Sequence, residues 1–191
     1  MALTATLYRF VLEISDIDRG VYETIEERVA CHPSEDHERL VVRVLARAIA
    51  HEEGLDFGRG LSTPDDAALW THSPVGEIER WIEVGAPTAE RLHRSSKRCA
   101  TLQVFTNKTP IPLQREWSSR AVHRSESVEI VQLPTDVVAK LAADLGRAAH
   151  WYITIHEGQL SVSDGAEMNL AGPIVRRSLD DFLAFDFTNE R

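Results

Sequence analysis

The sequence has few cysteines and no long apolar run. Its two cysteines, Cys31 and Cys99, lie in different segments without a C-x-x-C or Cys/His zinc spacing, which argues against a disulfide framework and a zinc knuckle. Reduced thiols are therefore expected. No stretch of about 18 apolar residues occurs, so a membrane-spanning helix is excluded. The N-terminus also lacks the basic region and continuous apolar run of a signal peptide. These features predict a cytoplasmic protein.

Several catalytic motifs are absent, and positive charge is scarce. The eight histidines include no H-E-x-x-H, and neither G-x-S-x-G nor G-x-x-x-x-G-K-[ST] occurs, so the patterns of zinc proteases, α/β-hydrolases and P-loop enzymes are missing. A total of 21 Lys and Arg against 30 Asp and Glu gives a net charge of -9. Because nucleic-acid binding depends on neutralising phosphates, a protein that coats nucleic acid is disfavoured. A local basic groove on an acidic body is still compatible with this charge.

Alternating strand and helix patterns predict a single domain of mixed structure. The 191 residues, 43% of them hydrophobic, suffice for a substantial core. Residue types typical of strands occur over 5–14, 78–84, 101–106, 128–133, 151–156 and 159–163, and helical patterns occur after 34, after 87 and over 113–123 and 136–147. Residues 21–30 fit a helix and a hairpin strand equally well. The alternation predicts an α+β or α/β fold in which helices flank a mixed central sheet. Residues 1–170 form the domain, and 171–191 are expected to be a C-terminal tail.

The helix expected after Ser34, its predicted N-cap, is amphipathic. Apolar residues from Leu40 to Ile49 form one stripe, while Arg39, Arg43 and Arg47 are expected on the other side. Glu38 falls on the flank of the apolar stripe. It either pairs with one of the arginines or belongs to a catalytic neighbourhood.

The stretch from Pro64 to Lys97 carries the clearest chemical signal. An acidic turn, Asp65 and Asp66, precedes a strand on which Glu83 lies among apolar residues, where an unpaired carboxylate is costly. Two acids and a lysine are the groups that a metal-dependent phosphodiesterase needs, because carboxylates hold a hard cation and an ammonium orients water or neutralises phosphate. Glu83 is merely solvated if its strand lies at a sheet edge.

The helix expected after Pro87 has a basic face. His93, Arg94 and Lys97 share this face with Glu90 at helical spacing. Such a face is either solvated or in contact with phosphate, and with its position next to Glu83 the two interpretations fit equally well.

Six short blocks occur in order along the chain. They are M-A-L-T-A-T-L-Y at the N-terminus, H-P-S-E from His32, R-G-L-S from Arg59, P-D-D from Pro64, W-I-E-V-G from Trp81 and H-R-S-S-K from His93. Together they resemble the YaeQ family, whose fold is similar to a variant of the PD-(D/E)XK nuclease fold. The likeness extends from residue 1 to about residue 165.

The resemblance implies a magnesium-dependent nuclease. Asp65 matches the first acid, with Asp66 as its rival, and Glu83 matches the second; together the two acids are expected to hold Mg²⁺. Gly85 stands where the superfamily has its strand lysine, so Lys97 is expected to supply the ammonium from the following helix.

The same resemblance assigns three further residues. Glu38 matches an acid that such folds place on their first helix, and His93 and Arg94 are expected to contact the nucleic-acid backbone. Two alternatives remain. One is a catalytically inert scaffold that binds a protein or nucleic acid, and the other is a buried ion-pair network of Glu38, Asp65, Glu83 and Lys97.

Overall fold

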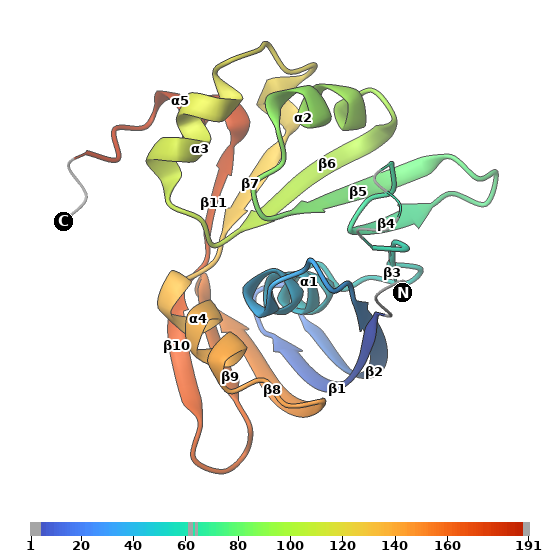
Figure 1. Cartoon of the computed structure of the whole chain (residues 1–191), viewed down its shortest axis with the longest axis vertical. Coiled ribbons are helices and arrows are strands. Elements are labelled where there is room, and N and C mark those ends of the chain that lie inside the picture. The colour runs from blue at the N-terminus through green and yellow to red at the C-terminus, as the bar shows by residue number, and fades with distance from the viewer. Residues whose placement is uncertain (1–4, 61–62, 64, 189–191) are drawn as a thin grey trace.

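The structure, a computed structural model, describes residues 5–60, 63 and 65–188. Leu61, Ser62 and Pro64, which belong to two of the blocks matched above, lie outside the described residues, as do residues 1–4 and 189–191. The described residues form two mixed β-sheets with helices packed between them and over one outer face (Figure 1). The expected mixed α+β class is confirmed, with two sheets in place of one central sheet.

The first sheet has the strand order β10-β9-β8-β1-β2. Strands β1 and β8 are parallel, and the other neighbours are antiparallel. Residues 21–30, whose sequence fits a helix and a strand equally well, lie in the second strand of the β1–β2 hairpin. The strands are β1 (Thr6–Asp16), β2 (Val21–Cys31), β8 (Ala148–His156), β9 (Gln159–Ser163) and β10 (Asn169–Pro173).

The second sheet has the strand order β11-β7-β6-β5-β4-β3. Its centre, β5 to β7, is parallel, and antiparallel strands flank it on both sides. The strands are β3 (Asp56–Phe57), β4 (Leu69–His72), β5 (Ile78–Val84), β6 (Cys99–Thr106), β7 (Glu129–Gln132) and β11 (Val175–Ser178).

The helices divide between two apolar clusters. Helices α1 (His37–Ile49) and α4 (Thr135–Ala143) join one cluster with apolar residues from both sheets, and α1 lies between the sheets (Figure 1). The outer face of the second sheet packs in another cluster with α2 (Ala89–Ser96), α3 (Pro110–Trp117) and α5 (Leu179–Ala184). A short 3-10 turn, η1 (Ser125–Ser127), precedes β7. No helix in the described part of the chain is long and apolar enough to cross a membrane.

Helix α1 differs from its prediction in two respects. Its N-cap is Asp36, whose side chain accepts a hydrogen bond from the Arg39 amide, whereas Ser34 was expected. Arg43 and Arg47, expected on the side away from the apolar stripe, are buried. The reason is that α1 is covered on both sides, and carboxylates there accept from the buried guanidinium groups.

The segment expected as a C-terminal tail belongs to both sheets. Residue 171 lies within β10, and β11 pairs antiparallel with β7. Leu179 and Phe182 of α5 are fully buried in the outer cluster. Strands β10 and β11 and helix α5 are therefore part of the folded domain and not a separate tail.

Candidate functional site

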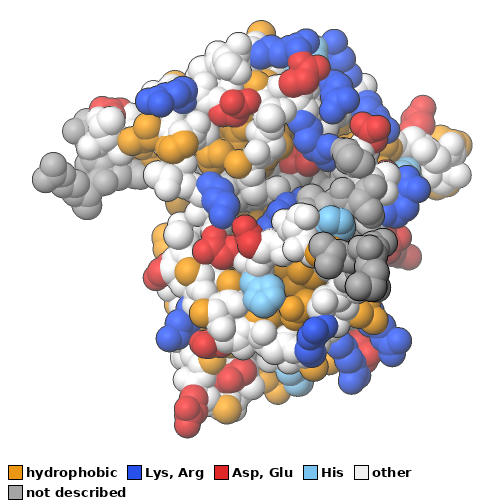
Figure 2. All heavy atoms as spheres, viewed as in Figure 1, with side chains coloured by type: hydrophobic (Ala, Val, Ile, Leu, Met, Phe, Trp, Pro, Cys, Tyr) orange, Lys and Arg blue, Asp and Glu red, His pale blue; other side chains and the backbone are white. Residues whose placement is uncertain are grey.

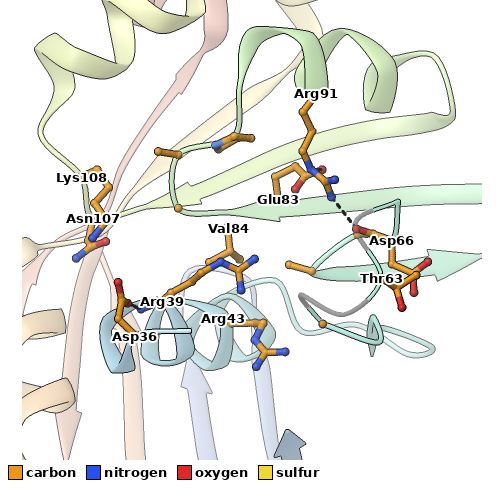
Figure 3. Close-up of a pocket in the computed structure, with 16 residues that line it drawn as sticks. Asp36, Arg39, Arg43, Thr63, Asp66, Glu83, Val84, Arg91, Asn107 and Lys108 are labelled. Carbon is orange, nitrogen blue, oxygen red and sulfur yellow. Dashed lines mark hydrogen bonds and ion pairs between the residues drawn. The ribbon is translucent and has the colours of Figure 1, made fainter. Parts of the chain in front are cut away.

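A pocket of about 350 Å³ lies beyond the carboxyl ends of β5 and β6. Strand β5 and its following loop contribute Glu83, Val84 and Gly85, and the segment just after β6 contributes Asn107 and Lys108. The opposite walls come from α1, α2 and the segment before β4 (Figure 3). In open α/β sheets, ligands bind beyond the carboxyl ends of parallel strands. The pocket is therefore the candidate site.

Glu83 is the buried acid of this pocket, with an exposed fraction of 3%. The alternation of β5 directs Trp81 and Glu83 toward α2. The Glu83 Oε1 accepts from the Trp81 indole at 2.7 Å and the Ser95 hydroxyl at 3.2 Å, and Arg91 Nε lies 2.7 Å away. A partner for this carboxylate was expected from its costly position on the strand, and the partner is a guanidinium.

Asp66, and not Asp65, is the acid of the turn that lines the pocket. The Asp66 amide donates to the Thr63 carbonyl at 3.1 Å in this turn, and its carboxylate takes both Arg59 Nε at 2.7 Å and Arg59 Nη2 at 3.1 Å. The hydrogen bond from Arg59 holds the pKa of Asp66 below its usual value. Asp65 has a side chain that is 76% exposed, so its expected placement beside Glu83 is wrong.

Arg91 links the two acidic segments. While Arg91 Nε pairs with the Glu83 carboxylate, Arg91 Nη2 donates to the Asp66 main-chain carbonyl at 2.6 Å (Figure 3). The Arg91 guanidinium thus lies between strand β5, which carries Glu83, and the turn that carries Asp66.

Lys97 does not reach the carboxylates. It is the C-cap of α2, its side chain is exposed, and it does not line the pocket. The expected placement of its ammonium over the acids is wrong, because the first turn of α2 faces the pocket and presents Arg91 there. His93 bonds to the Ala121 carbonyl at 3.0 Å, and the Arg94 side chain is 58% exposed. Neither of these side chains lines the pocket.

Glu38 lies next to the pocket and contacts two residues that line it just after β6. Its carboxylate accepts from Asn107 Nδ2 at 2.9 Å and Lys108 Nζ at 3.1 Å. The hydrogen bonds from Asn107 and Lys108 lower the pKa of Glu38. The cation paired with Glu38 is therefore Lys108 and none of the α1 arginines, and the buried network of Glu38, Asp65, Glu83 and Lys97 does not form.

The α1 wall holds an arginine pair that the sequence reasoning missed. Arg39 Nη1 and Arg43 Nη2 contact the two oxygens of the single Glu35 carboxylate, at 2.6 and 2.8 Å. Both arginines line the pocket. The Arg43 Nε is buried without a hydrogen-bond partner among the described residues, and burial lowers the pKa of Arg43. The i, i+4 spacing of Glu35 and Arg39, repeated to Arg43, is the signal from which this pair was detectable.

The donor set does not fit Mg²⁺ in this arrangement. A hard cation takes oxygen ligands, but Asp66 is bound by Arg59 and Glu83 by Arg91. Among the described residues, no group of three Asp, Glu, His or Cys side chains could hold a metal ion. Both guanidinium groups would have to withdraw before the two acids could act as ligands.

Comparison with known proteins gives a consistent result. The family model described as "YaeQ protein" matches residues 1–171. The uncharacterised protein YaeQ of Escherichia coli (strain K12) is 29% identical over 174 residues, which cover 89% of this chain and 96% of that protein. The crystal structure of the YaeQ protein from Pseudomonas syringae is 36% identical with a TM-score of 0.81, covering 89% of this chain and 94% of that one. The YaeQ structure from Xanthomonas axonopodis pv. citri is 29% identical with a TM-score of 0.83, covering 92% and 99%. The chain therefore belongs to the YaeQ family.

Proposed function

We propose that the pocket binds a phosphate group of a nucleic-acid partner and does not hydrolyse it. The observation that carries this proposal is the Arg39–Arg43 pair, in which one Glu35 carboxylate serves two guanidinium groups. With Asp36, the N-cap of the same helix, this wall has two carboxylates and two guanidinium groups, so the proposal depends on the placement of the arginines and not on a net charge of the wall. Guanidinium groups match phosphate oxygens in charge and geometry.

The pair is also fixed in position before a ligand arrives. Glu35 is 7% and Arg43 2% exposed, and Arg43 Nη2 bonds to the Ala30 carbonyl at 2.8 Å as well. A held side chain loses less rotamer freedom when it binds, so more of the interaction energy contributes to affinity. Each arginine uses one terminal nitrogen for Glu35.

Three features argue against hydrolysis at this site. Gly85 offers no side chain at the strand lysine position, and Lys97 is exposed. Asp66 and Glu83 are neutralised by arginines, so neither of them acts as a free base or metal ligand. The inert scaffold is therefore the alternative that the geometry favours.

The binding proposal is tested with a fluorescently labelled single-stranded oligonucleotide and its anisotropy at low salt. Arg39→Gln should weaken binding about tenfold or more, because charge-assisted hydrogen bonds contribute about 1.5–3 kcal/mol. Arg28→Gln, an exposed arginine on β2 away from the pocket, is the matched control and should bind as the parent does. Equal affinities of the two variants would exclude the pocket as the phosphate site.

Magnesium-dependent phosphodiester hydrolysis is the second candidate. The observation in its favour is that Asp66 and Glu83 line one pocket at the end of β5. We expect calorimetric titration with Mg²⁺ or Mn²⁺ to give no binding heat, because both acids already have guanidinium partners. Cleavage of an oligonucleotide that needs Mg²⁺ and disappears in Asp66→Asn would replace the binding proposal with a hydrolytic one.

A further inference from the structure

We propose that single-stranded nucleic acid extends from this pocket along α2 and stacks a base on Trp70. The inference depends on the proposed phosphate binding and names the form of nucleic acid that the same site takes. Its starting point is a small second hollow of about 50 Å³, lined by Trp81, Ser95, Arg98 and others. Arg91 lines both this hollow and the pocket, so the two are neighbours.

The surface around the second hollow is basic. Arg94, Lys97 and Arg98 are exposed at the carboxyl half of α2 and just beyond it. Figure 2 shows Lys and Arg side chains gathered over α2. The Arg94 guanidinium meets Asp65 only at 3.8 Å, and both side chains are largely exposed, so this pair contributes little. On a chain with a net charge of -9, cations concentrated here complement a phosphate backbone.

An accessible aromatic side chain lies beside these cations. Trp70 pairs across the strands with Trp81, and their rings meet edge to face at 5.8 Å. The exposed His72 ring lies 4.9 Å from Trp70, and the Arg98 guanidinium lies over Trp81 at 4.9 Å. Bases stack on such aromatic and guanidinium surfaces with little sequence preference. Because a stacked base must be unpaired, this surface fits a single strand.

The different burial of the four tryptophans allows stacking on Trp70 to be measured by fluorescence. Of the four tryptophans, Trp81, Trp117 and Trp151 are at most 4% exposed, whereas Trp70 is only partly buried. A base that stacks on Trp70 should therefore quench its fluorescence selectively.

The experiment compares three probes of equal length and charge: oligodeoxythymidylate, the same sugar-phosphate chain without bases, and polyglutamate. We expect both nucleic-acid probes to bind by anisotropy competition, and only oligodeoxythymidylate to quench. Trp70→Leu should lose about five- to a hundredfold in affinity for oligodeoxythymidylate, the range of one base stack, while binding the abasic probe as the parent does. Trp70→Phe should bind but show no quenching.

A control and the contrary outcomes separate this inference from the proposed function. Val75→Ser, on the exposed tip of the same β4–β5 hairpin, should behave as the parent. Equal affinity of the parent for the thymidylate and abasic probes without quenching would overturn base stacking and leave phosphate binding intact. Failure of both nucleic-acid probes to bind would overturn both proposals. Polyglutamate binding with the affinity of the thymidylate probe would assign the surface to an acidic protein segment instead.

Discussion

The Arg91 guanidinium explains how Glu83 is tolerated inside the protein. Burying an ionised carboxylate is costly unless a charge partner and hydrogen bonds compensate. The Oε1 atom of Glu83 accepts hydrogen bonds from Trp81 and Ser95 and pairs with Arg91. Arg91 also donates to the Asp66 carbonyl. The acid and the base are therefore fixed together, and removing either leaves the other uncompensated.

Substitution of Glu83 tests this dependence. Glu83→Ala should lower the free energy of unfolding by about 3–5 kcal/mol, because it leaves the Arg91 charge without its carboxylate. Urea denaturation followed by circular dichroism measures the loss. Glu26→Gln is the control: it breaks the exposed Arg9–Glu26 ion pair, and such pairs contribute about 0–1 kcal/mol. A loss of under 1 kcal/mol for Glu83→Ala would show that the pair is not a structural requirement.

At this scale the sequence predicts one buried charge, Glu83, but not its partner, and it misses the buried Arg43 and Arg47. Glu83 was predicted because its cost on an apolar strand is a local property. Its partner Arg91 depends on how α2 packs over β5, which is tertiary information.

Asp65 and Asp66 are neighbours in a turn. A shift of the turn by one residue would exchange which of their carboxylates faces the pocket, and the sequence does not determine that shift. Lys97 was misplaced because α2 ends before it.

The elements themselves were largely predictable where the patterns are long. Strand β5 coincides with its predicted range, 78–84, because its alternation is strong. Helices α3 and α4 were predicted too long; α4 ends at Ala143, and β8 begins at Ala148. Short strands such as β4 and β11, each of four residues, are too brief for a periodic signal.

Helix α5 lies in the segment expected as a C-terminal tail, and its packing makes a prediction about stability. Phe182 is fully buried and contacts Trp117, with ring centroids 5.1 Å apart. Phe182→Ala should destabilise the protein by about 3–5 kcal/mol through lost burial and a cavity. Phe185, 38% exposed in the same segment, supplies the control, and Phe185→Ala should cost clearly less. Thermal denaturation compares the two; equal losses would contradict the assignment of α5 to the core.

Over the whole molecule, one apolar cluster joins the two sheets. It includes Phe10 and Trp151 from the first sheet and Ile82 and Phe105 from the second, with α1 between them. A shared core predicts that neither sheet keeps its structure without the other. The molecule should therefore unfold in one cooperative step.

Two tryptophans report on this cooperativity. Trp117 lies in the outer cluster beside the second sheet, and Trp151 lies on β8 of the first. Variants that keep only one of them, with the other tryptophans replaced by phenylalanine, should have the same urea dependence for fluorescence as for circular dichroism. Midpoints that differ between the fluorescence and circular-dichroism curves of one variant would reveal sequential unfolding.

The last part of the chain completes both sheets. Strands β10 and β11 are separated by Ile174 alone, and each lies at an edge, one in each sheet (Figure 1). Since translation proceeds from the N-terminus, these strands leave the ribosome after everything they pair with. A nascent chain halted before residue 169 would expose the pairing edges of β9 and β7 and the hollow that α5 fills, a state in which chaperones would recognise it. For this protein, both sheets and the outer cluster should close only after residues 169–184 have been synthesised.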